Sequence, residues 1–187
     1  MFPQPDAIDR VFDRIPAPGG SHGARPFVVA VSGIDCCGKS TLAKTLAAEA
    51  EQRGLSAAVL GIDDFIRPAS IRENRQPAHL GYFEEVFDYA RFVAELEQLS
   101  AGSGLHLLIA EGVFLFRREL ISRWHLKIWL EMDPALSLER GPVRDAGFFG
   151  SVQAARSAYE ETFIPAYRMH LERDRPMQQA DMVFEVF

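Results

Sequence analysis

The chain has 187 residues, a length that fits one domain with a sizeable hydrophobic core. With 48% hydrophobic and 25% charged residues it has the composition of an ordinary globular protein, and no apolar run reaches the roughly 18 residues of a membrane helix. A formal net charge of -6 argues against general nucleic-acid binding, which depends on Lys and Arg neutralising phosphates. We therefore expect neither a membrane nor a nucleic acid as partner.

The N-terminal residues predict an appendage to the main domain. The opening MFPQPDAIDRVFDRIP has neither a basic leader nor a long apolar core, so we expect no secretory signal and a cytoplasmic protein. Residues 6–15 carry apolar side chains at spacings of three and four, which predicts a short amphipathic helix. The next stretch, APGGSHGARP, is typical of a linker. Residues 1–26 are thus expected to form a helix and linker, and residues 27–187 the domain.

Strand and helix signals alternate along the rest of the chain. Buried strands are predicted at 27–32, 57–62, 105–110, 126–130 and 182–186. Helices are predicted at 40–53, 89–99 and 151–172. Such alternation predicts an α/β fold, in which helices cover both faces of a parallel sheet.

The strongest chemical signal follows the first predicted strand. Residues 33–40, GIDCCGKS, match the phosphate-loop pattern G-x-x-x-x-G-K-[ST] at every fixed position. In this pattern glycines let backbone N–H groups converge on phosphate oxygens at a helix N-terminus, the Lys reaches the β and γ phosphates, and the Ser binds Mg²⁺. We therefore predict ATP and Mg²⁺ as cofactors. The predicted nucleotide contacts of the loop are Gly33, Asp35, Cys36, Cys37, Gly38, Lys39, Ser40 and Thr41.

Two adjacent cysteines lie inside this loop. A disulfide between sequence neighbours would be strained, so we expect both thiols to be free. We prefer the interpretation that Cys36 and Cys37 are small side chains at positions where the backbone does the binding. The alternative hypothesis is that Cys37, near a helix N-terminus and Lys39, has a depressed pKa and makes the protein redox-sensitive.

A phosphate loop alone does not separate a kinase from a GTPase or an ATP-driven machine. The guanine-reading sequence N-K-x-D does not occur here, and the chain is short for a transport or remodelling ATPase. A small-molecule kinase needs a base for the acceptor hydroxyl. Asp63, in LGIDDFIRP, is our candidate because it directly follows the second strand, and ligands bind beyond the carboxyl ends of parallel strands. Its neighbour Asp64 is more often a turn cap than a second base.

A kinase also needs an acid near Mg²⁺ and cations for the transferring phosphoryl group. Glu111, in LHLLIAEGVFLF, ends the third strand and can hold Mg²⁺ through water, although a solvated carboxylate is the alternative. Arg140, Arg144 and Arg156 surround a Gly-rich segment that we interpret as a lid, which excludes water and neutralises charge. The alternative is that they are ordinary exposed helix arginines.

Taken together, these motifs resemble the uridine kinase-like branch of the P-loop kinases, within the wider group of uridine kinase, phosphoribulokinase and pantothenate kinase. The resemblance runs from about residue 27 to the C-terminus. It implies that residues 33–41 are the phosphate loop, that Asp63 is the base, that Glu111 belongs to an E-G pair and that Arg140 and Arg144 are lid arginines. It also implies transfer of the γ-phosphoryl group of ATP to a primary hydroxyl, typically the 5′-OH of uridine or cytidine.

The acceptor side departs from that pattern. Ile66 stands where nucleoside-reading members have Tyr, and GYFEEVFD replaces their N-F-D-H-P-D sequence. Substitutes for the missing sugar contacts come from this replacement: Tyr82, Glu84, Glu85 and Asp88. Cations also gather in this region, which would suit an acceptor bearing a carboxylate or phosphate: Arg67, Arg72, Arg75 and His79.

We therefore predict a P-loop NTPase fold, a three-layer α/β/α sandwich with five parallel strands in the order 2-3-1-4-5 and an Arg-bearing lid. Lys39, Asp63 and Arg144 are the predicted catalytic residues, and Ser40 and Glu111 the predicted metal ligands. The predicted acceptor contacts are Asp63, Phe65, Arg67, Tyr82 and Glu111. Two alternatives to a uridine or cytidine kinase stay open: a kinase of an acidic molecule, such as a sugar phosphate, pantothenate or glycerate, and an ATP-dependent binding module without kinase activity. A homo-oligomer also stays open.

Overall fold

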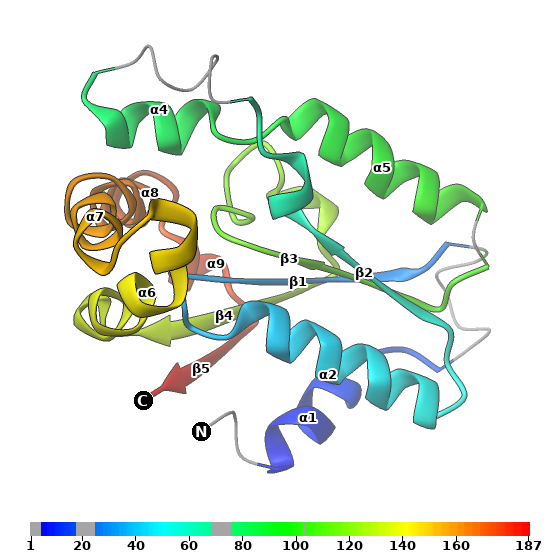
Figure 1. Ribbon diagram of the computed structural model, residues 1–187. Coiled ribbons are helices and arrows are strands. Elements are labelled where there is room, and N and C mark those ends of the chain that lie inside the picture. Colours follow the sequence, from blue (N-terminus) through cyan, green and yellow to red (C-terminus); the bar gives the residue numbers. More distant parts are fainter. Residues whose placement is uncertain (1–4, 18–24, 69–75, 103) are drawn as a thin grey trace.

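A five-stranded parallel sheet forms the centre of the computed structural model, which describes residues 5–17, 25–68, 76–102 and 104–187. The strand order is β2-β3-β1-β4-β5, and every neighbouring pair is parallel, as predicted (Figure 1). The strands are β1 (Phe27–Gly33), β2 (Ala57–Gly61), β3 (Leu107–Glu111), β4 (Leu126–Met132) and β5 (Met182–Val186).

Burial explains the apolar character of the middle strands. All five residues of β3 are buried, and so are six of the seven residues of β1. Strands covered on both faces need continuous apolar runs, whereas β2 and β5, at the two edges, are only partly buried. Because β1, β2 and β3 are parallel, their carboxyl ends lie along the same side of the sheet, which we call its carboxyl edge, and the phosphate loop begins there.

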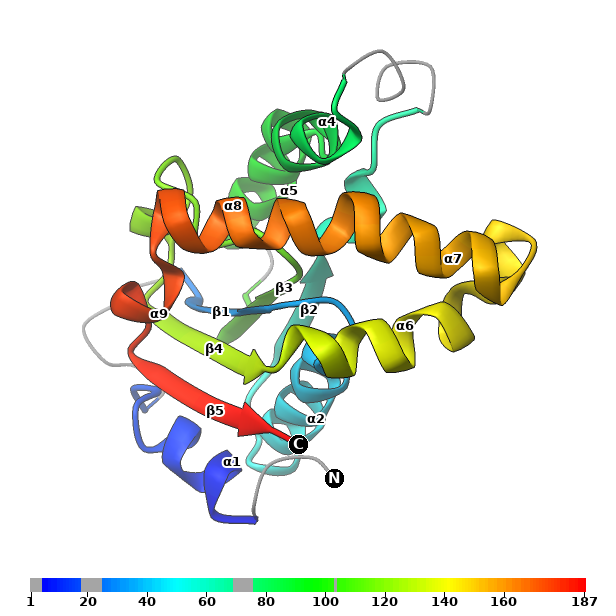
Figure 2. The same ribbon diagram turned by 90° about the vertical axis from the view of Figure 1, so that its left-hand side faces the viewer.

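Helices cover both faces of the sheet (Figures 1 and 2). On one face lie α1 (Pro5–Phe12) and α2 (Lys39–Gln52), and on the other lie α4 (Ala78–Glu85), α5 (Tyr89–Gly102) and α8 (Ile164–Asp174). Shorter elements connect them: η1 (Ile62–Phe65), η2 (Ile121–Arg123) and α9 (Pro176–Gln179). No helix among the described residues is long and apolar enough to cross a membrane.

The N-terminal helix α1 packs onto the domain. Ala7 and Val11 are buried in the same hydrophobic core as the sheet. Arg53, just after α2, forms an ion pair with Asp9 and lies over the ring of Phe12, 4.2 Å from its centroid. Helix α1 therefore contributes to the core that residues 27–187 build, and the division at residue 26 stays a prediction.

A helical hairpin extends from the carboxyl edge of the sheet (Figure 2). It consists of α6 (Pro134–Phe149) and of α7 (Val152–Ala158), which runs through the π-helical turn η3 (Tyr159–Phe163) into α8. The predicted helix at 151–172 is thus confirmed, although a π turn interrupts it. Helix α6 takes the place of the predicted Gly-rich lid segment: Asp133 caps it by accepting the N–H of Ala135 at 2.8 Å, and Gly150 ends it in a left-handed conformation.

A close contact with Tyr159 explains the glycine inside α6. A Cβ atom at Gly141 would overlap the ring and hydroxyl of Tyr159, which is itself fully buried. The two arms of the hairpin can therefore approach this closely only because residue 141 has no side chain.

We expect Gly141→Ala to lower the free energy of unfolding by about 1–3 kcal/mol, because the added methyl group overpacks this contact. The matched control is Gly147→Ala on the same helix, where nothing lies within 4 Å of the new atom. Since Ala is a better helix former than Gly, the control should be neutral or stabilising by up to about 1 kcal/mol. Urea titration of both variants measures the difference, and equal effects would contradict the packing account.

Candidate active site

The phosphate loop lies between β1 and α2, as predicted, and glycines shape both of its ends. A Cβ atom at Gly33 would lie 2.5 Å from the carbonyl oxygen of Leu130 and 2.8 Å from the sulfur of Cys37. Gly38 has φ 94° and precedes the first turn of α2 without a side chain to cap it. The N–H groups at the start of α2 are therefore available to an anion.

Lys39 holds the loop in shape from inside. Its ammonium donates a hydrogen bond of 2.8 Å to the carbonyl of Ile34, and the residue is 9% exposed. Burial lowers the pKa of Lys39, but the acidic groups around it outweigh that effect and the net direction is upward. These groups are Cys37, Asp35, Glu111 and Asp63. Lys39 is therefore a buried cation that faces several acidic side chains.

The two predicted metal ligands lie next to each other. Glu111, at the end of β3, is buried, and burial raises the pKa of its carboxyl group. A hydrogen bond with Ser40 and the charge of Lys39 lower this pKa, but the effect of burial is larger and the net direction is upward. Gly61 pairs with Glu111 across the sheet, and the carboxylate comes within 3.3 Å of where a Cβ would stand at Gly61. A hydroxyl and a carboxylate are thus combined at one point beside the loop.

Asp63 lies where the sequence predicts it, in the turn η1 directly after β2, and it is exposed. Its charge contributes to the upward pKa directions of Lys39, Glu111 and Tyr82. An exposed carboxylate within electrostatic reach of the phosphate loop can contact a molecule that enters from solvent.

Arg140 and Arg144, both on α6, face the loop across a cavity of about 360 Å³. The residues that line this cavity are Cys36, Gly38, Lys39, Ser40, Thr41, Arg140 and Arg144. Helix α6 is also anchored to the loop, because the hydroxyl of Ser137 donates to the backbone carbonyl of Asp35 at 2.9 Å. Arg156, the third predicted lid cation, pairs instead with Glu160 at 3.7 Å and does not line the cavity.

Aromatic rings pack around Tyr82, one of the predicted acceptor contacts. The ring of Tyr82 lies 4.6 Å from that of Phe163 and 5.7 Å from that of Phe114, measured between centroids. Burial raises the pKa of the Tyr82 hydroxyl well above its ordinary value, and the charges of Asp35 and Asp63 add to this effect. Tyr82 is thus within electrostatic reach of both carboxylates.

The other predicted acceptor contacts differ in their placement. Phe65 is buried and meets Phe92 edge to face at 5.3 Å, so its ring supports the turn that carries Asp63. Arg67 is half-buried, and its backbone N–H donates to the carbonyl of Val86 at 2.8 Å. Arg72 and Arg75 lie outside the described residues.

The two cysteines have different surroundings, and both are free, as predicted. Cys37 is 1% exposed, and burial raises its pKa despite the opposing charge of Lys39. The hypothesis of a depressed Cys37 pKa is therefore wrong in direction, because the position is too buried to favour a thiolate. Cys36 is half-buried, and burial raises its pKa as well.

Three residues that join α6 to the loop were not predicted from the sequence. Tyr159 and Asp145 contact Arg144, and Ser137 contacts the loop backbone. One available signal was Gly141, since a glycine inside a helix often marks a close packing contact.

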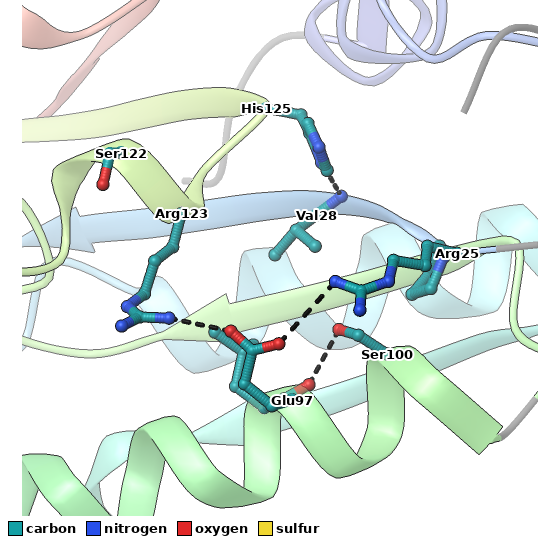
Figure 3. A pocket seen from close by; sticks show the side chains of 9 residues that line it. Arg25, Val28, Glu97, Ser100, Ser122, Arg123 and His125 are labelled. Atoms are coloured by element: carbon teal, nitrogen blue, oxygen red, sulfur yellow. Dashed lines mark hydrogen bonds and ion pairs between the residues drawn. The ribbon is translucent and has the colours of Figure 1, made fainter. Parts of the chain in front are cut away.

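A second cavity, of about 380 Å³, lies at the amino ends of the strands, away from the phosphate loop (Figure 3). Its charges pair among themselves, because Glu97 contacts Arg123 at 2.8 Å and Arg25 at 3.8 Å. His125 accepts the backbone N–H of Val28 at 2.8 Å. Ligands of parallel sheets bind at the carboxyl ends, so the cavity beside the loop is the candidate active site.

Known proteins resemble this chain at a distance. No protein-family model matches it. Uridine-cytidine kinase B of Dictyostelium discoideum is 24% identical over 173 residues, which cover 79% of this chain and 70% of that protein.

Solved structures share the fold over most of the chain. A possible uridine kinase from Bacillus stearothermophilus is 21% identical, with a TM-score of 0.71 and coverage of 96% of this chain and 97% of that one. A candidate fructose transport system kinase from Silicibacter sp. TM1040 is 23% identical, with a TM-score of 0.78 and coverage of 95% and 97%. Phosphoribulokinase from Rhodobacter spheroides is 15% identical, with a TM-score of 0.64 and coverage of 87% and 71%.

The sheet order and the phosphate loop, together with these likenesses, define the fold of a P-loop kinase. More narrowly, this is the fold of the uridine kinase and phosphoribulokinase-like branch, the same branch that the sequence motifs resemble.

We expect iodoacetamide to modify Cys36 before Cys37 in the folded protein, because Cys36 is half-buried and Cys37 is almost inaccessible. Mass spectrometry of peptides from a time course measures both rates. In Cys36→Ser, labelling of Cys37 should stay slow and should accelerate when urea unfolds the protein. Faster labelling of Cys37 than of Cys36 in the folded chain would contradict the burial assigned to it.

Proposed function

We propose that this protein is an ATP-dependent small-molecule kinase that transfers the γ-phosphoryl group to an alcohol, with the 5′-OH of uridine or cytidine as the first candidate acceptor. One observation carries the proposal: the exposed carboxylate of Asp63 lies within electrostatic reach of the phosphate-loop ammonium of Lys39. A nucleotide-binding module needs the lysine, but an exposed acid at this strand end has an evident use only where a hydroxyl must be activated.

The loop and α6 supply the phosphate contacts in this proposal. The N–H groups at the start of α2 and the ammonium of Lys39 bind the phosphates from one side, and Arg140 and Arg144 bind them from the other. Positive groups on both sides of the cavity stabilise the charge that spreads over the transferring phosphoryl group.

The residues present fit a magnesium ion. Mg²⁺ prefers oxygen ligands and is commonly held by one or two carboxylates, with waters and phosphates completing its shell. The hydrogen-bonded pair of Ser40 and Glu111 offers a hydroxyl and a carboxylate, and no cluster of three or more His, Cys, Asp or Glu occurs among the described residues. Bound Mg²⁺ would neutralise charge on the phosphates, and Ser40 and Glu111 would hold it there.

Asp63 acts on the acceptor in this proposal. Its carboxylate accepts the hydroxyl proton, or orients it, as the oxygen attacks the phosphoryl group. The half-buried rings of Tyr82 and Phe163 offer flat apolar faces against which a nucleobase can stack. The relative named as a uridine-cytidine kinase supports the same acceptor class.

A second candidate is a kinase of an acidic acceptor or a sugar. Arg67 follows the turn that carries Asp63, so a carboxylate or phosphate could be recognised there. Two structural neighbours are named as a phosphoribulokinase and as a fructose transport system kinase, so sugars and sugar phosphates belong among the acceptors to be tested.

The test is ADP release from Mg-ATP with a panel of acceptors: uridine, cytidine, other nucleosides, pantothenate, glycerate, fructose and sugar phosphates. We expect one acceptor class to stimulate release in the wild-type protein. Asp63→Asn should lower the stimulated kcat by on the order of 10²–10⁴-fold and leave ATP binding intact, because it removes only the base. Lys39→Ala should lose turnover through weaker phosphoryl stabilisation.

Asp64→Asn is the matched control, because it removes a carboxylate from the adjacent exposed position. It should retain most of the activity. An Asp63→Asn variant as active as this control would contradict the base assignment. ATP hydrolysis that no acceptor stimulates would contradict the proposed kinase activity and favour an ATP-dependent binding module.

A further inference from the structure

The hydroxyl of Tyr159 is the meeting point of three segments. It comes from the first residue of the π turn η3, and it contacts Asp145 and Arg144 of α6 and Cys36 of the phosphate loop. The sequence positions of Cys36 and Tyr159 are 123 residues apart. A single oxygen atom thus joins both arms of the hairpin to the loop.

Hydrogen-bond counting assigns a direction to each contact. A tyrosine hydroxyl has one proton to donate and two lone pairs to accept with. The proton goes to Asp145 Oδ2 at 2.8 Å, since a carboxylate only accepts. One lone pair accepts from Arg144 Nη2 at 3.2 Å, and the other accepts the S–H of Cys36, with 3.4 Å between sulfur and oxygen. The hydrogen-bonding capacity of this oxygen is therefore fully used.

Arg144 is held by one edge. Its Nε and Nη2 donate to the two carboxylate oxygens of Asp145 at 2.7 Å and 2.9 Å, a bidentate pair. The Nη1 donors lie on the other side of the same planar group. Because Arg144 lines the cavity opposite Lys39, a guanidinium held by its Nε and Nη2 edge can still offer Nη1 to a phosphate oxygen.

The directions of the pKa shifts indicate the charge of each group in this network. The bond to Asp145 raises the pKa of Arg144, and the bonds from Arg144 and Tyr159 lower the pKa of Asp145 even though burial opposes them. Burial raises the pKa of Tyr159 and of Cys36. Near neutral pH the group therefore consists of a cation, an anion, a neutral phenol and a neutral thiol.

Holding Arg144 in one conformation lowers the entropic cost of binding a phosphate. Its side chain is 57% exposed, and an exposed arginine must lose much rotational freedom before it can bind a phosphate. Tyr159 is fully buried and locked by its contact with Gly141, so it provides a rigid reference for Asp145.

We propose that Tyr159 is a positioning residue: its hydroxyl, through Asp145, fixes the guanidinium of Arg144 toward the nucleotide phosphates and, through Cys36, keeps it in register with the phosphate loop. This inference deepens the proposed function and depends on it, since it assumes that the cavity binds nucleotide phosphates. Tyr159 and Asp145 act through Arg144 and do not themselves contact the transferring group.

The test is a double-mutant cycle on nucleotide binding, measured by calorimetry with Mg-ATP and Mg-ADP in the absence of any acceptor. Tyr159→Phe removes the hydroxyl but keeps the ring against Gly141. We expect it to weaken Mg-ATP binding by about tenfold, the scale of a lost hydrogen bond to a charged group. Arg144→Ala should weaken binding by at least as much. The double variant should then bind as Arg144→Ala does, because a positioning residue has no effect once the residue it positions is gone.

Two further variants separate positioning from folding. Tyr167→Phe, on α8, is the matched control: Tyr167 is also buried, but its hydroxyl has no hydrogen-bond partner among the described residues, so Mg-ATP binding should not change. Asp145→Asn removes the charge that holds Arg144 and should reproduce the Tyr159→Phe effect, and it provides an independent test if Tyr159→Phe does not fold.

Several outcomes would overturn the inference. Wild-type binding by Tyr159→Phe and Asp145→Asn would do so, and so would losses that add in the double variant, since additive losses indicate a general structural role. Tighter binding in Tyr159→Phe would mean that the hydroxyl restrains Arg144 instead of presenting it. Failure of the proposed function would look different: wild-type protein would bind Mg-ATP with these same differences, yet no acceptor would stimulate ADP release.

Discussion

The site depends on one buried cation at the carboxyl edge of the sheet. The ammonium of Lys39 bonds the loop carbonyl of Ile34 and faces acidic side chains that follow three neighbouring strands. These side chains are Asp35 after β1, Asp63 after β2 and Glu111 at the end of β3. A buried charge is tolerated only when it is paired, and these acidic side chains supply the opposite charge for Lys39. The strand order β2-β3-β1 is what brings them together, because parallel neighbours end at the same edge.

The second half of the site is built by the helical hairpin. Helix α6 places Arg140 and Arg144 across the cavity from Lys39, and Ser137 ties its first turn to the loop. A phosphate between them would contact positive groups from two separate elements. In the proposed function the acceptor enters beside Asp63, whose charge reaches Tyr82. The proposed function places phosphate binding and hydroxyl activation on adjoining surfaces, which is the arrangement that a phosphoryl transfer requires.

Local sequence was enough to predict the strands, their parallel arrangement and the loop, because each depends on short patterns, whereas the strand order came with the resemblance to the P-loop kinases. Asp63 and Glu111 could be found from their place after a strand. Helix α6 could not, since Gly141 and Pro142 weaken its helical pattern while the contact with Tyr159 that stabilises it is distant in sequence. Phe65 illustrates a related limit: a phenylalanine two residues after the proposed base can face a ligand or the core, and only its packing against Phe92 distinguishes the two.

The most direct test of the account is the fate of the γ-phosphoryl group, followed by ³¹P NMR as the wild-type protein turns over Mg-ATP with uridine, cytidine and the other acceptors in separate samples. The account predicts a phosphate-monoester signal that grows in step with ADP for one class of acceptor and does not appear with Asp63→Asn. Inorganic phosphate as the product with every acceptor would contradict it, because the carboxyl edge of this sheet would then direct the phosphoryl group to water.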